Sequence, residues 1–195
     1  MILVVDIGNT NIEFGVFEDK ELNCKFRIGT NREATSDDIG LKLRQFLFIN
    51  KIEIEEIEDV VIESVVPQVM YSINNAIKKY LCKNPIILGE NFCVPIANKY
   101  ENPAAVGADR LVNAYSALKK YGAPLIVVDF GTATTFDAVN RDGEYEGGAI
   151  FTGIRISTDA LFQKTAKLPM VELAHTDKII GKSTSLTNHF LIKNP

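Results

Sequence analysis

The apolar positions at the start of the chain follow the two-residue period of β-strands. Residues 2–5 form a continuous apolar run that ends at Asp6, as is typical of a buried strand. Residues 11–17 alternate between apolar and polar, and a turn at 18–20 leads to another apolar stretch at 22–28. These segments predict three strands that form a β-meander.

The pattern then changes to the longer period of α-helices. Apolar residues at helical spacing follow the helix-starting residues 36–38, and a second such set predicts a helix over 69–81. Between them, the β-branched run at 59–66 predicts a strand that ends at Pro67. The further predicted elements are a strand over 85–88, a helix over 111–118, strands over 125–128, 134–139 and up to Ile150, and a helix over 153–167.

One strand-and-loop segment occurs twice in the chain. Residues 4–11 read VVDIGNTN and residues 127–134 read VVDFGTAT. In both places the order is strand, Asp, loop, strand, strand, helix, and the strand at 125–128 is expected to be buried like the first. The repeat predicts two related α/β halves around a cleft, over residues 1–119 and 120–195.

Composition narrows the class of protein. The chain has 195 residues, 46% hydrophobic and 24% charged, which suits one large or two small globular domains. A net charge of −4 argues against nucleic-acid binding, and we expect no membrane span and no signal peptide. The thiols Cys24, Cys82 and Cys93 include no CxxC pair, so we expect reduced cysteines and a cytoplasmic protein. His175 and His189 are too isolated for a metal cluster.

The two Asp-containing loops are candidates for phosphate binding. An Asp at the carboxyl end of a buried strand lies where open α/β sheets bind ligands, and the following Gly lets the backbone approach a ligand closely. Asn9, Thr10, Thr132 and Thr134 add short polar side chains. The carboxylate is compatible with phosphate when Mg²⁺ or its waters lie between them. The chain contains neither GxxxxGK[ST] nor GxGxxG, which excludes a P-loop and a Rossmann dinucleotide site.

Several segments together resemble one enzyme family. VVDIGNTN and VVDFGTATTFD resemble the phosphate loops of the actin, hexokinase and Hsp70 superfamily. KYENPAAVGADRLVNA, SVVP, EGGAIFTGIRIS, TAKLP and IGKST, taken in their order along the chain, resemble type III pantothenate kinase. The resemblance implies duplicated ribonuclease H-like domains and phosphorylation of pantothenate to 4′-phosphopantothenate, the first step of coenzyme A synthesis. It also implies ATP, Mg²⁺, a monovalent cation (K⁺ or NH₄⁺) and a homodimer.

The same resemblance implies roles for individual residues. The ATP loop would comprise Asp6, Ile7, Gly8, Asn9, Thr10, Asn11, Ile12 and Glu13, with Asp6 also handling Mg²⁺, and Thr132 would be a further ATP contact. Asp129 would bind the monovalent cation and Asp109 would be the catalytic base. The pantothenate contacts would be Tyr100, Gly107, Ala108, Asp109, Arg110 and Thr184.

The chemistry of the GADR segment agrees with these roles. A carboxylate at Asp109 can accept the proton of a hydroxyl that attacks a phosphate, and the Arg110 guanidinium suits either a substrate carboxylate or phosphate oxygens. Without the resemblance, the same pair would be a helix N-cap Asp beside a surface Arg.

After Thr184 the chain reads SLTNHFLIKNP, which departs from the family, so we expect an incomplete second domain. A frameshift, a fragment or a short homologue completed by a partner chain would each explain this. Uncovered apolar faces and a weaker ATP site would follow. The alternative function is a non-catalytic pantothenate- or partner-binding homologue, distinguished by binding without turnover, and a third is a related sugar or small-alcohol kinase.

Overall fold

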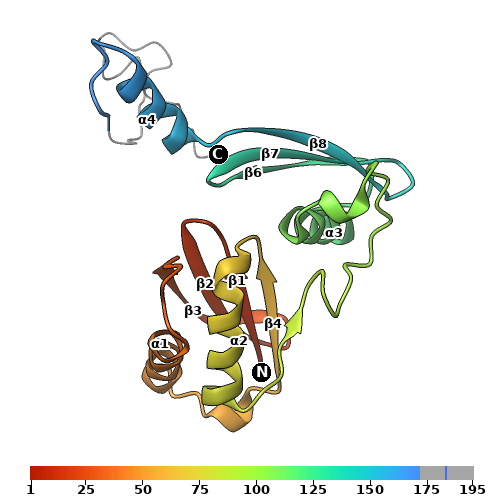
Figure 1. Cartoon of the computed structure of the whole chain (residues 1–195). Coiled ribbons are helices and arrows are strands. Elements are labelled where there is room, and N and C mark those ends of the chain that lie inside the picture. Colours follow the sequence, from red (N-terminus) through yellow and green to blue (C-terminus); the bar gives the residue numbers. More distant parts are fainter. Residues whose placement is uncertain (172–182, 184–195) are drawn as a thin grey trace.

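The computed structural model describes residues 1–171 and 183 and contains two β-sheets (Figure 1). Among these residues, no helix is both long enough and apolar enough to cross a lipid bilayer. The elements around the first sheet are β1 (Ile2–Ile7), β2 (Asn11–Glu18), β3 (Glu21–Gly29), α1 (Ser36–Ile49), η1 (Ile54–Glu56), β4 (Asp59–Ser64), α2 (Pro67–Leu81) and β5 (Ile86–Ile87).

The first sheet has the strand order β3-β2-β1-β4-β5. β1 and β2 are antiparallel, as are β2 and β3, whereas β4 pairs with β1 and β5 in parallel. This is the order of a ribonuclease H-like fold, so the predicted fold class is confirmed. Leu3, Val5 and Ile7 are fully buried in a core that includes apolar residues of α1 and α2.

The start of α1 shows how local sequence fixes an element. Thr35 is the N-cap, and its side chain accepts a hydrogen bond from the backbone N–H of Asp38 at 3.2 Å. The Asp38 carboxylate in turn accepts from the backbone N–H of Thr35 at 2.9 Å. This reciprocal capping box satisfies two backbone donors and begins the helix next to the predicted residues 36–38.

The second sheet repeats the first meander. Its strands follow the order β6-β7-β8, and each neighbouring pair is antiparallel. The helix before this sheet, α3 (Ala108–Tyr121), packs against one face of it. The contact joins Leu111, Ala114 and Leu118 of the helix to Val139 and Tyr145 of the strands. The elements are η2 (Pro103–Ala105), α3 (Ala108–Tyr121), β6 (Leu125–Phe130), β7 (Ala133–Val139), β8 (Tyr145–Thr152) and α4 (Ile154–Lys164).

The other face of the second sheet corrects one expectation. β6 is not buried on both sides, because Ile126 is 70% exposed and Phe130 is 71% exposed. Val128 pairs with Phe136, as Val5 pairs with Phe14 in the first sheet. We call the exposed side chains the apolar face of the second sheet; they are Ile126, Val128, Phe130, Phe136 and Phe151.

The predicted domain boundary between residues 119 and 120 falls inside α3. This helix contacts β6 and β7 of the second sheet and β4 of the first. The division of the chain at this position therefore stays a prediction, and the structure adds that α3 bridges the two sheets.

Candidate active site

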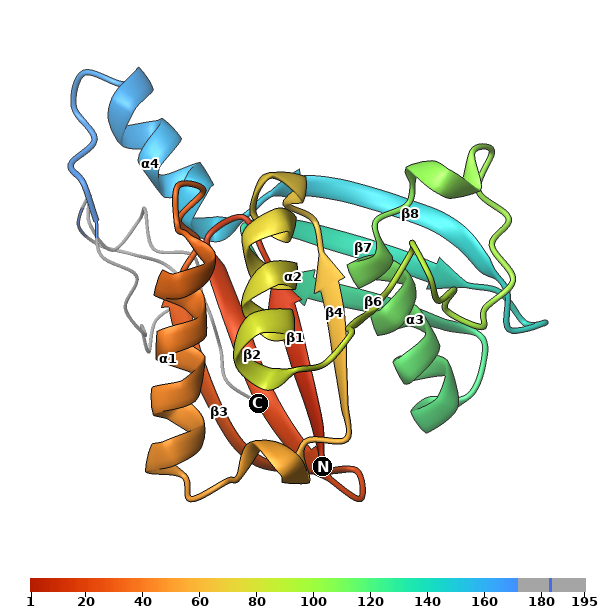
Figure 2. The ribbon, with the colours of Figure 1, turned by 60° about the horizontal axis from the view of Figure 1, so that its bottom comes forward.

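The two repeated loops meet where the two sheets come together. Figure 2 shows the carboxyl end of β1 beside that of β6. In the first loop, the backbone N–H of Gly8 donates to the carbonyl of Asn11 at 2.9 Å. In the second, Gly131 N–H donates to the carbonyl of Ala133 at 3.0 Å. The hydroxyl oxygens of Thr10 and Thr132 lie 3.0 Å apart, so the two loops face each other.

In each half, a residue that directly follows the third strand of the meander holds the loop by hydrogen bonds. The Thr30 hydroxyl donates to the Gly8 carbonyl at 2.6 Å, and the Thr30 N–H donates to the Thr10 carbonyl at 3.0 Å. In the second half, the Gly153 N–H donates to the Thr132 carbonyl at 3.1 Å, as the Thr30 N–H does to the Thr10 carbonyl in the first. A Cβ on Gly153 would lie 2.2 Å from the Thr132 carbonyl oxygen, so only glycine allows this approach.

The side chains of the predicted ATP-loop residues differ in their exposure to solvent. Ile7 and Ile12 are buried in the core, so only their backbone atoms are available to a ligand. Glu13 forms an ion pair with Arg27 on β3. Asp6 is exposed near the carboxyl end of β1, Gly8, Asn9 and Thr10 form the turn to β2, and Asn11 is the first residue of β2.

Carboxyl groups from four elements gather around Asp6. Partial desolvation raises the pKa of Asp6, and the negative charges of Glu13, Asp109 and Asp129 raise it further. A hydrogen bond with Glu63 opposes this rise. The structure thus brings the predicted catalytic base and the predicted cation ligand into the neighbourhood of the first phosphate loop.

Glu63 is a member of this group that the sequence analysis did not single out. It lies opposite Asp6 in the parallel pairing of β1 and β4, and its side chain is only 8% exposed. Burial raises its pKa to about 8, and Asp109 and Asp6 contribute to the rise. Its Oε1 atom has no hydrogen-bond partner. The available signal was a charged residue directly after the apolar run VVI of β4, DVVIES.

The acidic group suits an indirectly held cation. Among the described residues, no three acidic, histidine or cysteine side chains are arranged to ligate a metal ion directly. Mg²⁺ commonly keeps several waters and binds through one or two carboxylates together with substrate phosphates. Asp6, beside the phosphate loop and an incompletely paired Glu63, fits that mode of binding.

The GADR segment forms the first turn of α3. Gly107 is the N-cap and Asp109 lies in the first turn, so the alternative reading of Asp109 as the N-cap is wrong. The Asp109 Oδ1 accepts a hydrogen bond from the Arg110 N–H at 2.8 Å. A Cβ on Gly107 would lie 2.4 Å from this oxygen, so glycine makes room for the carboxylate. The positive end of the helix dipole favours a carboxylate here.

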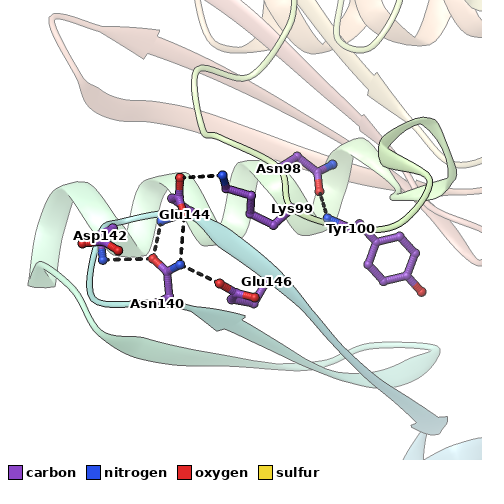
Figure 3. Close-up of polar contacts among 7 residues, drawn as sticks. All are labelled: Asn98, Lys99, Tyr100, Asn140, Asp142, Glu144 and Glu146. Atoms are coloured by element: carbon purple, nitrogen blue, oxygen red, sulfur yellow. Dashed lines mark hydrogen bonds and ion pairs between the residues drawn. The ribbon is translucent and has the colours of Figure 1, made fainter.

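The predicted pantothenate contacts lie on both sides of this turn. Arg110 is not a surface residue but is 9% exposed and ion-paired with Asp137 on β7. Tyr100 is 38% exposed, and its backbone N–H donates to the Asn98 side chain at 3.0 Å (Figure 3). Thr184 lies outside the described residues. Asp137 ends the quoted segment VVDFGTATTFD but was given no role, because a sequence does not show which strand carboxylate faces an arginine.

The sequence comparisons identify the family. A family model described as type III pantothenate kinase matches residues 2–187. A type III pantothenate kinase of Finegoldia magna is 50% identical over 184 residues, which cover 94% of this chain and 70% of that protein. The chain belongs to the type III pantothenate kinase family. The predicted family, and with it a phosphotransferase that acts on pantothenate in coenzyme A synthesis, is confirmed.

Two solved structures share the fold of this chain. A Campylobacter jejuni protein described as a conserved Baf family transcriptional activator has a TM-score of 0.54 at 20% identity, covering 96% of this chain and 72% of its own. A Sinorhizobium meliloti protein described as a 2-dehydro-3-deoxygalactonokinase has a TM-score of 0.53 at 14% identity, covering 85% of this chain and 57% of its own. At these identities the similarity concerns the fold alone.

Proposed function

We propose that this chain transfers the γ-phosphoryl group of ATP to the primary hydroxyl of pantothenate, with Asp109 as the base that accepts the hydroxyl proton. The observation that carries the assignment is the position of Asp109, which lies in the first turn of α3 and interacts electrostatically with Asp6 of the phosphate loop. A hydroxyl placed between these groups would face both a proton acceptor and a bound γ-phosphate.

The phosphate loops would hold ATP from two sides. Thr10 and Thr132 lie within hydrogen-bonding distance of each other, so a polyphosphate at this point would contact both loops. Backbone N–H groups and short hydroxyl side chains suit its oxygens. Asp6 would hold Mg²⁺ through water, and the ion would offset the charge on the phosphates.

Arg110 and Tyr100 would bind pantothenate. The guanidinium is ion-paired with Asp137 through Nη2, and the Arg110 side chain is 11% exposed. Its N–H groups that do not face Asp137 would donate to an acceptor oxygen of pantothenate. Gly107 and Ala108 would contribute backbone at the helix start, and Thr184 would add a contact from the second half.

The proposal also includes three features that family membership supports. They are a K⁺ or NH₄⁺ ion at the exposed Asp129, a homodimer, and a cytoplasmic location.

A coupled assay of ADP release tests the proposal. Purified protein with ATP, Mg²⁺ and K⁺ should release ADP only when pantothenate is present. Asp109→Asn should lower kcat by about a hundredfold or more, because general-base catalysis contributes about 10²–10⁴-fold. Asp142→Asn, at an exposed acid in the turn after β7, is the matched control and should retain activity. Full activity in Asp109→Asn would overturn the base assignment, and pantothenate binding without turnover would favour the non-catalytic alternative.

A further inference from the structure

A buried carboxylate on β7 holds the predicted pantothenate arginine. Asp137 is 1% exposed, and its Oδ1 lies 2.7 Å from Nε and 2.6 Å from Nη2 of Arg110. Arg110 belongs to the first turn of α3 and Asp137 to the second sheet. The ion pair therefore fixes the guanidinium across the junction between a helix and a sheet.

Two further side chains surround the same carboxylate. The Tyr145 hydroxyl donates to Oδ1 of Asp137 at 2.7 Å, and the Thr135 hydroxyl donates to Oδ2 at 3.2 Å. Tyr145 is fully buried, and its ring lies 5.9 Å from the Arg110 guanidinium carbon. Burial and Asp137 raise the pKa of Tyr145, so the phenol stays protonated and remains a donor.

The backbone of Tyr145 holds the second predicted pantothenate contact. Its N–H donates to the Ala97 carbonyl at 2.8 Å, and its carbonyl accepts from the Lys99 N–H at 2.8 Å. The segment that ends in Tyr100 is thereby attached to the start of β8. Figure 3 shows the same segment joined to the hairpin by Lys99, whose ammonium group lies 3.1 Å from the Glu144 carboxylate.

Two consecutive glycines of β8 leave space for these two side chains. A Cβ on Gly147 would lie 3.2 Å from the Tyr100 ring, and the residue has a φ of +132°, which favours glycine. A Cβ on Gly148 would lie 2.7 Å from Nη2 of Arg110 and 1.9 Å from the Phe136 carbonyl oxygen. The β7–β8 hairpin is thus shaped around Tyr100 and Arg110 together.

Stability alone is a weak explanation for this arrangement. Burying an ion pair costs desolvation energy, and apolar residues of similar size often serve a core equally well or better. A fixed guanidinium with a donor to spare, however, can orient a ligand without losing side-chain entropy on binding. Tyr145 takes part in both contacts: its ring lies near the Arg110 guanidinium, and its backbone is hydrogen-bonded to the segment that ends in Tyr100.

We propose that Asp137 and Tyr145 are positioning residues for pantothenate, Asp137 by aiming Arg110 and Tyr145 by joining Arg110 to the segment that carries Tyr100. This inference rests on the proposed function, because Arg110 and Tyr100 are assigned to pantothenate there. Neither positioning residue needs to touch the substrate.

The first test measures binding by isothermal titration calorimetry with pantothenate and, separately, with a non-hydrolysable ATP analogue. Asp137→Asn keeps the shape but removes the charge, and Tyr145→Phe removes only the hydroxyl. We expect pantothenate affinity to fall by about tenfold or more in Asp137→Asn and by about threefold in Tyr145→Phe, with ATP-analogue affinity unchanged. The matched controls are Asp142→Asn on the same hairpin and the exposed Tyr121→Phe on α3.

The second test asks whether Asp137 acts through Arg110. On an Arg110→Lys background, Asp137→Asn should weaken pantothenate binding by less than it does alone, because coupled residues are not additive. Additive effects, or an equal loss of affinity for both ligands, would overturn the inference. If Asp137→Asn does not fold, Tyr145→Phe decides, and unchanged pantothenate affinity in that variant would also overturn it.

The outcomes separate the inference from the proposed function. Wild-type protein that binds pantothenate but releases no ADP would contradict the kinase proposal, and the binding assay would still decide on Asp137. Wild-type protein that does not bind pantothenate would overturn both. In an active enzyme, the KM for pantothenate should rise in Asp137→Asn while the KM for ATP stays the same.

Discussion

Individual carboxyl groups in this site differ sharply in their surroundings. Asp6 is exposed, whereas Glu63, its neighbour across the β1–β4 pairing, is 8% exposed and has an oxygen without a partner. Burial, Asp109 and Asp6 together move the pKa of Glu63 from 4.5 to about 8. A group of this kind makes the stability of the folded protein depend on pH.

The sign of that dependence follows from the direction of the shift. Because the folded state binds the Glu63 proton more tightly than the unfolded state, the stabilisation is complete below pH 4.5 and is lost as the pH rises through about 8. Glu63→Gln cannot ionise and should not show this loss. Thermal unfolding in EDTA should give similar Tm values for both proteins at pH 5 and, at pH 9, a Tm higher in Glu63→Gln by roughly 4–8 °C, for about 2 kcal/mol.

Glu55→Gln, at an exposed acid of η1 on the amino-terminal side of β4, is the control and should follow the wild-type protein. Equal Tm values for Glu63→Gln and wild type at pH 9 would show that Glu63 is solvated and ionised in the folded protein.

The residues that the sequence analysis named share a visible local signal. Asp6 and Asp129 each end an apolar run and precede a glycine, so their places at strand ends could be predicted. Glu63 and Asp137 could not be assigned, because each depends on a partner distant in the sequence: Asp109 for one and Arg110 for the other. Such pairs arise from packing, which a periodic pattern does not encode.

Among the elements, the contact between α1 and α2 depends on a glycine. A Cβ on Gly40 would lie 2.0 Å from the Tyr80 ring, with three ring atoms closer than 3 Å. Tyr80 cannot move freely, because its hydroxyl donates to Asp37 at 2.9 Å. The two helices therefore approach through this position, and a larger residue would force them apart.

Gly40→Ala should destabilise the protein in spite of the higher helix propensity of alanine. Overpacking of this kind costs about 1–3 kcal/mol, which corresponds to roughly 2–12 °C in Tm for a chain of this size. Thermal unfolding by circular dichroism measures the change. Gly29→Ala is the control, because a Cβ there meets no atom within 4 Å. A Tm at or above the wild-type value in Gly40→Ala would mean that Tyr80 moves aside at no cost.

The sequence patterns predicted the eight strands and four α-helices of the described residues, because their apolar periods are regular, but neither of the short helices η1 and η2. What they could not predict is which faces are covered. LIVVDF in β6 resembles ILVVDI in β1, yet Val128 is 41% exposed and Val5 is fully buried. Burial on that face depends on helices elsewhere in the chain, such as α1 and α2 at the first sheet.

For the molecule as a whole, this difference leaves a large apolar face on the second sheet. Figure 1 shows α3 on one side of β6–β8. Ile126, Val128 and Phe130 are exposed and alternate along β6 with Leu125 and Val127, which are partly buried. Contiguous exposed apolar surface of this kind favours association and the binding of apolar dyes.

Ile126→Lys combined with Phe130→Lys should reduce both the association of the protein and its binding of apolar dyes. We expect lower fluorescence of an added apolar dye and less light scattering at raised protein concentration than for wild type, because two charges interrupt the face. Phe48→Lys is the control, since Phe48 is 83% exposed on α1 and lies outside this face. Unchanged dye binding in the double variant would show that the face is covered in solution.

The position of α3 connects the arrangement of the two sheets to the geometry of the proposed active site. Asp109 travels with a helix whose apolar side packs on the second sheet, whereas Asp6 is fixed in a strand of the first. The relative position of the two sheets therefore sets the separation of these two carboxyl groups. A ligand that clamps Thr10 to Thr132 would set that position, so filling one substrate subsite would adjust the spacing at the other.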